Sequence, residues 1–192
     1  MKWTRRAAVV ASGLALAAMM QVGVASAATT QKHTAPVQRF ADGSVVAGAS
    51  STLLRNGTGA TFSLHTRELA AGHTITVWWV IFNHPENCSH GMLGLRCGEG
   101  DLFEPSVEAS VVYGAGHVIG GSGVAGYGGW IGVAETDGAL FGPGLLEPFT
   151  ADIHLVVHDH GVLSPQQIAE GVHNFGPCNP CVDVQFSAHE VI

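Results

Sequence analysis

Short runs of β-branched and aromatic residues, separated by clusters of Gly, Pro and Asn, recur along the sequence. The clusters NGTG, NHPENCSHG and GPCNPC argue against long helices, because Gly and Pro favour turns. The run HTITVWWVIF is apolar on both faces in its second half, which predicts a central, covered strand. Five segments have the composition of strands: residues 60–69, 73–82, 106–113, 151–160 and 182–192.

One short helix is expected near the end of the chain. Ser164 has the residue type of an N-cap, Pro165 suits the first helical position, and Gly171 ends the segment. The Gly-rich segment 114–130 lacks the Lys-Ser/Thr of a phosphate loop, so we interpret it as turns and bends. Many strands with one helix predict an all-β fold, an antiparallel β-sandwich of the immunoglobulin-like or Greek-key type.

The first 27 residues have the three parts of an export signal. A basic start (MKWTRR) precedes an Ala-rich apolar run and the small-residue exit ASA, which predicts cleavage after Ala27. A retained membrane anchor is the alternative, but polar and glycine residues interrupt the run. The Ala-rich style is typical of bacteria. We expect a flexible N-terminal segment at 28–36 and a single domain at 37–192.

The charge of the expected mature chain restricts its partners. The signal contains three of the eight basic residues and none of the 15 acidic ones, which leaves a net charge of −10. Such a chain repels phosphate backbones and anionic lipid, so we expect no nucleic-acid partner. No second apolar run is long enough to span a membrane after signal cleavage. We expect a secreted protein, extracellular or in the cell envelope, with any protein or surface partner unknown.

Four cysteines lie in the expected mature chain. They are Cys88, Cys97, Cys178 and Cys181. An even number of cysteines in an exported protein predicts two disulfides, and we favour local pairs, although a cross-link between the two loops is an alternative. The first pair, with the histidines beside it, would also suit a zinc site. The second pair has the spacing of a redox motif, but Pro180 and the strand after it favour a structural clip.

The stretch ADIHLVVHDH concentrates three histidines in seven residues. Its β-branched residues favour a strand, and the zinc-protease motif of a helix would need Glu where Leu155 stands. On a strand, alternate residues share a face. One face is then apolar, with Ile153, Leu155 and Val157. The opposite face carries Asp152, His154, Val156, His158 and His160.

This polar face has two interpretations. Imidazoles two residues apart on a strand can close on one ion, and neutral imidazole suits zinc or copper. We therefore predict a metal site whose candidate ligands are His154, His158 and His160, with Asp152 and His189 as helpers. The alternative is a solvated or hydrogen-bonded face that carries histidines without a metal. A blue-copper site is excluded, because Met92 is the only methionine after the signal and none follows the last cysteine.

The stretch DIHLVVHDHG resembles a strand of secreted CHRD-type domains, and it is similar to the His-x-His strand of copper-zinc superoxide dismutases. His158 and His160 match that element. The resemblance implies a β-sandwich and, in the dismutases, copper and zinc ligands with a catalytic arginine near the C-terminal end. No arginine follows Arg96, so we carry over the fold and a metal role but no reaction.

The sequence therefore predicts an exported protein of unknown role that binds a transition metal through its His-rich strand. The competing hypothesis is a non-catalytic extracellular or envelope binding module without a metal. In that case Gly-rich loops and an exposed Trp would make the contacts. No motif assigns a catalytic residue.

Overall fold

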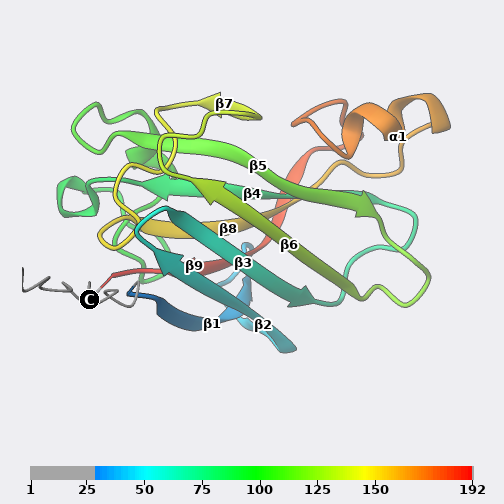
Figure 1. The fold of residues 1–192 in the computed structure, drawn as a ribbon. Coiled ribbons are helices and arrows are strands. Elements are labelled where there is room, and N and C mark those ends of the chain that lie inside the picture. Colours follow the sequence, from blue (N-terminus) through cyan, green and yellow to red (C-terminus); the bar gives the residue numbers. More distant parts are fainter. Residues whose placement is uncertain (1–28, 192) are drawn as a thin grey trace, which may run out of the picture.

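The computed structural model describes residues 29–191, so the predicted export signal at residues 1–27 lies outside the described residues. Within that range the fold is all-β with one short helix, as the sequence predicts. The strands, all paired antiparallel, form one curled sheet in the order β6-β3-β2-β1-β9-β8-β4-β5-β7 (Figure 1). They are β1 (Gln31–Arg39), β2 (Val45–Asn56), β3 (Gly59–Thr66), β4 (Thr74–Phe82), β5 (Ala109–Val118), β6 (Ala125–Gly132), β7 (Ala139–Phe141), β8 (Asp152–Asp159) and β9 (Val182–His189).

The two halves of the sheet face each other across the main core. Side chains of β2, β3 and β6 pack there against those of β4, β5 and β8, as in a sandwich. Phe62 of β3 and Trp79 of β4 meet edge to face, with their ring centroids 4.9 Å apart. This interior contact joins two strands that are not neighbours in the sheet.

A second apolar cluster lies on the outer face of the same central strands. Trp78, Val80, Phe82, Val156 and Phe186 belong to it, together with residues of the β4–β5 segment. Every residue of β4 and of β8 is consequently buried. The sequence-based prediction of a central, covered strand at residues 73–82 is confirmed.

The N-terminal segment differs from the expectation. Residues 28–36 were expected to be flexible, but β1 begins at Gln31 and pairs with β2 along Gln31–Pro36. It continues to Arg39, where it pairs with β9. Ala35 and Val37 are buried. Residues 31–34 are exposed on both faces of β1, which explains the polar composition, and the pairing that orders the segment comes from β2 and β9.

The Gly-rich segment 114–130 differs in part from the expectation of turns and bends, because β5 continues to Val118 and β6 begins at Ala125, so that only the residues between them form a turn. Its glycines allow close approach. A Cβ atom on Gly114 would lie 2.8 Å from the carbonyl oxygen of Val77, and one on Gly129 would lie 2.7 Å from the ring of Phe62. A glycine inside a strand commonly marks such an approach.

Helix α1 (Pro165–Gly171) confirms the expected start and end signals. Ser164 is its N-cap, and the Ser164 hydroxyl donates to Gln167 Oε1 at 2.7 Å. Two short 3-10 helices, η1 (Pro85–Asn87) and η2 (Glu99–Phe103), lie between β4 and β5. Among the described residues, no helix has the length and apolar character that a membrane crossing needs.

Replacing Trp79 by Ala tests the interior contact. Trp79 is fully buried, so we expect Trp79→Ala to lower the free energy of unfolding by about 3–5 kcal/mol. Urea denaturation followed by circular dichroism measures this. Trp130→Ala is the matched control, because Trp130 is 55% exposed and its loss should change stability by less than about 0.5 kcal/mol. Equal effects of the two substitutions would contradict the described core.

Candidate metal centre

Strand β8 places its histidines on a covered face of the sheet. It lies between β4 and β9, and Ile153, Leu155 and Val157 point into the main core as the alternation predicts. The opposite face is not solvated: His154, His158 and His160 are only 6%, 3% and 0% exposed. The segments between β4 and β5 and between β8 and β9 cover this face. The solvated form of the metal-free alternative is therefore wrong, whereas a hydrogen-bonded histidine face without a metal stays a prediction.

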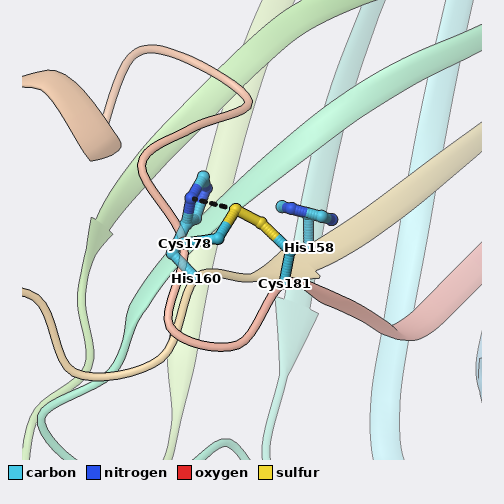
Figure 2. A group of neighbouring side chains, drawn as sticks. All are labelled: His158, His160, Cys178 and Cys181. Carbon is cyan, nitrogen blue, oxygen red and sulfur yellow. Dashed lines mark hydrogen bonds between the residues drawn. A yellow bond between two sulfur atoms is a disulfide. The ribbon is translucent and has the colours of Figure 1, made fainter.

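Four side chains converge at the end of β8. Each of His158, His160, Cys178 and Cys181 offers one ligand atom, and these atoms all lie within 4.8 Å of one another (Figure 2). The chain after α1 returns to this point: the Asn179 amide donates to the His160 carbonyl oxygen at 2.7 Å. Two nitrogens and two sulfurs in this arrangement are a donor set suited to zinc or copper(I).

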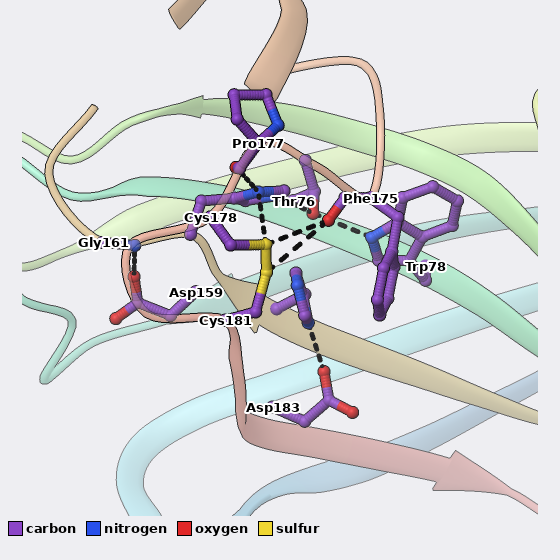
Figure 3. A network of polar contacts seen from close by, with 11 residues as sticks. Thr76, Trp78, Asp159, Gly161, Phe175, Pro177, Cys178, Cys181 and Asp183 are labelled. Atoms are coloured by element: carbon purple, nitrogen blue, oxygen red, sulfur yellow. Dashed lines mark hydrogen bonds and ion pairs between the residues drawn. A yellow bond between two sulfur atoms is a disulfide. The ribbon is translucent and has the colours of Figure 1, made fainter. Parts of the chain in front are cut away.

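The two cysteines of this cluster form a disulfide in this structure, as Cys88 and Cys97 do elsewhere. Both pairs are local, so the favoured pairing is confirmed. The Cys178 sulfur lies 3.3 Å from the Phe175 carbonyl oxygen and 3.9 Å from His160 Nδ1 (Figure 3). The disulfide is exposed, while the imidazoles beside it are buried. The sulfurs therefore have access to solvent reductants and ions.

His158 has one nitrogen occupied and one free. Its Nδ1 lies 2.6 Å from Asp183 Oδ1, and Figure 3 shows the Asp183 carboxylate on the side of the cluster away from Cys178. Its Nε2 is buried and has no hydrogen-bond partner among the described residues. When a carboxylate holds Nδ1–H, the lone pair is on Nε2, an arrangement typical of histidine ligands. Nε2 is thus the nitrogen that a metal would use.

His160 is held in one tautomer. Its Nδ1 lies 2.9 Å from the Pro177 carbonyl oxygen, which can only accept, so Nδ1 carries the proton. The Thr76 hydroxyl then donates to Nε2 at 2.9 Å. Burial lowers the pKa of His160 below its usual value of 6.5, which keeps the ring neutral at pH 7. Ligation through Nδ1 would replace the bond to Pro177.

Two further residues from the predicted ligand set lie away from this cluster. His154 is four residues from His158, about 13 Å along the strand, and its ring meets Phe82 edge to face at 5.1 Å. Asp152 lies about 20 Å from His158 by the same spacing. Its Oδ1 accepts from the Val191 amide at 2.6 Å, and Arg96 Nε is 3.7 Å from its Oδ2. The structure does not bring either side chain to the cluster.

His189 is on β9, which lies beside β8, but it points to the other side of the sheet. It is paired with Ile153, whose side chain is in the main core. Its Nε2 lies 2.7 Å from Ser51 Oγ, and its Nδ1 lies 3.1 Å from His33 Nδ1. Of the five predicted residues, the structure therefore brings His158 and His160 together, because the pleat and the strand length separate the others.

The sequence analysis missed the cysteines and Asp183 as members of this site. The C-x-x-C spacing of Cys178 and Cys181 was a usable signal, because that spacing also occurs in zinc sites. Nothing in the sequence pointed to Asp183, because regular alternation along the strand places its side chain on the same face as His189. The β8–β9 register shifts at this point, since Asp183 pairs with His158 and Gln185 with Val157. This irregularity turns Asp183 toward His158.

A second group that could hold an ion is Cys88, Cys97 and Asp101. The Asp101 carboxylate is fully buried and accepts from the backbone amides of Ser89 and Gly98 at 2.8 and 2.9 Å. Burial alone would raise the pKa of Asp101. The hydrogen bonds that its carboxylate accepts together outweigh this effect, so the pKa lies below its usual value. With its oxygens occupied and Cys97 in a disulfide, this group organises the β4–β5 segment.

Comparisons with protein-family models, with curated proteins and with solved structures found no match for this chain.

Stability should fall in acid because of His154. Burial lowers the pKa of His154 from its usual 6.5 to about 4. Between these values the unfolded chain binds a proton that the folded chain does not, so stability decreases as pH falls from 6.5 to 4. The loss from this residue is about 3 kcal/mol. We expect His154→Leu to flatten the profile of unfolding free energy against pH.

Urea denaturation across this pH range measures the profile. His65→Leu is the control, because His65 is exposed on β3, and its profile should match that of the parent. An unchanged slope for His154→Leu would show that His154 does not remain neutral in the folded protein.

Proposed function

We propose that this is an exported protein that binds one zinc or copper(I) ion through His158, His160, Cys178 and Cys181 when the two cysteines are reduced. The observation that carries the proposal is the convergence of four ligand atoms within 4.8 Å. The unpartnered Nε2 of His158 supports it independently. A buried polar atom without a partner is rare in folded proteins and requires an explanation.

The spacing of the ligand atoms is close to what a tetrahedral ion needs. Zn–S bonds of about 2.3 Å and Zn–N bonds of about 2.0–2.1 Å place ligand atoms about 3.3–3.8 Å apart. The longest separations in the cluster, up to 4.8 Å, have to shrink by about 1 Å, and the two sulfurs, which are bonded to each other in the disulfide, have to move apart. Cys178 and Cys181 are on an irregular segment, so these two side chains are the ones that move.

The surroundings of the cluster also favour a cation. Asp183 orients His158 as the second-shell carboxylates of metal sites do, and such partners commonly contribute about 10- to 100-fold to metal affinity. The buried His160 is neutral at pH 7, which is the form that binds metals. The whole chain has a net charge of −7, which favours cations over anions near its surface.

Metal binding and the disulfide exclude each other, because both use the same two sulfurs. Opening the Cys178–Cys181 bond takes two electrons and two protons, and binding of the metal then releases the thiol protons. The protein would accordingly hold metal under reducing conditions and release it on oxidation. This redox dependence distinguishes the proposed site from one built on histidines alone.

Export rests on the N-terminal signal sequence, with support from the cysteines. Both pairs form disulfides, and disulfides persist in oxidising compartments outside the cytosol. The bacterial origin suggested by the Ala-rich signal remains a prediction from the sequence.

Metal content tests the proposal. We expect the mature chain, purified without a His tag, reduced with a mild thiol and dialysed against zinc, to retain about one equivalent of zinc by mass spectrometry. The same protein in its oxidised form should retain much less. His158→Ala and the pair Cys178→Ser with Cys181→Ser should abolish retention. His65→Ala is the matched control and should load like the parent, because His65 is exposed on β3.

A zinc titration of each variant measures its affinity as well as its metal content. Asp183→Asn should weaken zinc binding by about 10- to 100-fold, because His158 loses its charged partner. Asp137→Asn removes the same charge from an exposed position and should leave the affinity unchanged. Equal zinc content in the oxidised and reduced forms, or in the cysteine variant and the parent, would contradict the proposed site.

A further inference from the structure

An apolar cavity of about 300 Å³ lies on the outer face of the central strands. Its floor is formed by Trp78, Val80 and Phe82 of β4, with Val111 of β5 and Val156 of β8. The face is thus hollowed at a place where side chains from three neighbouring strands are already packed against each other. The volume is at the small end of the range for small-molecule sites.

Three separate segments form the walls of the cavity. They contribute Leu102 and Phe103 from η2, Leu140 and Phe141 from β7, and Phe175 from the segment after α1. Phe103 is 78% exposed and Leu140 is 46% exposed. Exposed apolar side chains that gather around a hollow are typical of binding sites, because the water that they contact is released when a ligand covers them.

His154 provides the polar group of this otherwise apolar cavity. It lines the cavity, it is only 6% exposed, and its Nε2 has no hydrogen-bond partner among the described residues. Its neighbours in the sheet are Val80 and Ala188, and neither side chain can form a hydrogen bond. Nε2 is itself covered by protein atoms, so a ligand with one hydrogen-bonding group would satisfy it once a neighbouring side chain moves aside.

The charges at the cavity exclude anions. The charged residues that line it are Glu99 and Asp183, and no Lys or Arg is among its lining residues. Fatty acids and phosphates would place a negative charge near these carboxylates without a counter-ion. Burial lowers the pKa of His154 to about 4, so at neutral pH the imidazole has one donor and one acceptor and no charge.

We propose that the cavity binds a small, uncharged, mostly apolar molecule whose single hydroxyl or amine group forms a hydrogen bond with His154. The apolar walls take the hydrocarbon part of the ligand, and the imidazole determines its orientation. The site is separate from the metal cluster, since His154 is about 13 Å along the strand from His158, and it is present in the oxidised, metal-free protein. Two residues are shared: the Phe175 ring also stacks on His158 at 4.2 Å, and Asp183, which lines the cavity, also contacts His158 Nδ1.

N-phenyl-1-naphthylamine, an uncharged dye with one N–H group, is the probe. We expect saturable fluorescence enhancement with a stoichiometry of about one on the oxidised, metal-free protein. Competition should distinguish two molecules of similar shape: 2-naphthol should displace the dye at a concentration about tenfold lower than 2-methylnaphthalene, because only the naphthol hydroxyl pairs with His154.

Two variants assign the signal to the cavity. In His154→Leu the difference between the two competitors should disappear, while apolar binding persists. Val156→Phe should fill the floor and reduce dye binding at least tenfold. Trp130→Ala is the control and should bind like the parent, because Trp130 is exposed and lies outside the cavity. Each variant is used only if its circular dichroism spectrum and melting transition match those of a folded protein.

Three results would overturn the proposal. The first is the absence of saturable dye binding by the parent. The second is a competitor ratio that His154→Leu leaves unchanged. The third is occupation of the cavity by a second copy of the chain, seen as a concentration-dependent dimer in sedimentation that Phe103→Ser dissociates. Because no metal is present in any arm, failure here is independent of the result of the zinc experiments.

Discussion

The position of β8 at the centre of the sheet is the constraint on which the rest of this structure depends. Its backbone is paired on both edges, with β4 and with β9, and both of its faces are covered. Its histidines are consequently buried, and burial lowers the pKa of His154 and of His160. A neutral, fixed imidazole can bind a metal or form a hydrogen bond with an uncharged ligand through its lone pair, whereas a protonated imidazole has no lone pair for either.

Covering this face requires long connections, and each of them contains a disulfide. The β4–β5 segment is closed by Cys88 and Cys97, and the β8–β9 segment by Cys178 and Cys181. The first connection provides a wall of the apolar cavity, and the second brings two sulfurs to the end of β8. Phe175 belongs to both places, since it lines the cavity and stacks on His158.

Local pattern predicted much of the fold. Alternation identified β8 and its core face, the all-β class and the helix after Ser164 were confirmed, and the spacing of the cysteines indicated local pairs. What failed depended on contacts between distant segments. The burial of His154 depends on segments that come from other parts of the chain, and strand β1 is ordered by its partners. One irregularity in β9 places Asp183 beside His158, while His189 remains on the opposite face.

The central claim is that two sulfurs and two imidazoles bind the same ion. Zinc K-edge X-ray absorption on the reduced, zinc-loaded mature protein tests it directly. The account predicts two sulfur neighbours at about 2.3 Å and two nitrogen neighbours at about 2.0–2.1 Å, with the sulfur shell lost in the pair Cys178→Ser with Cys181→Ser. A first shell made only of nitrogen and oxygen would contradict it, as would a sulfur shell that this variant retains.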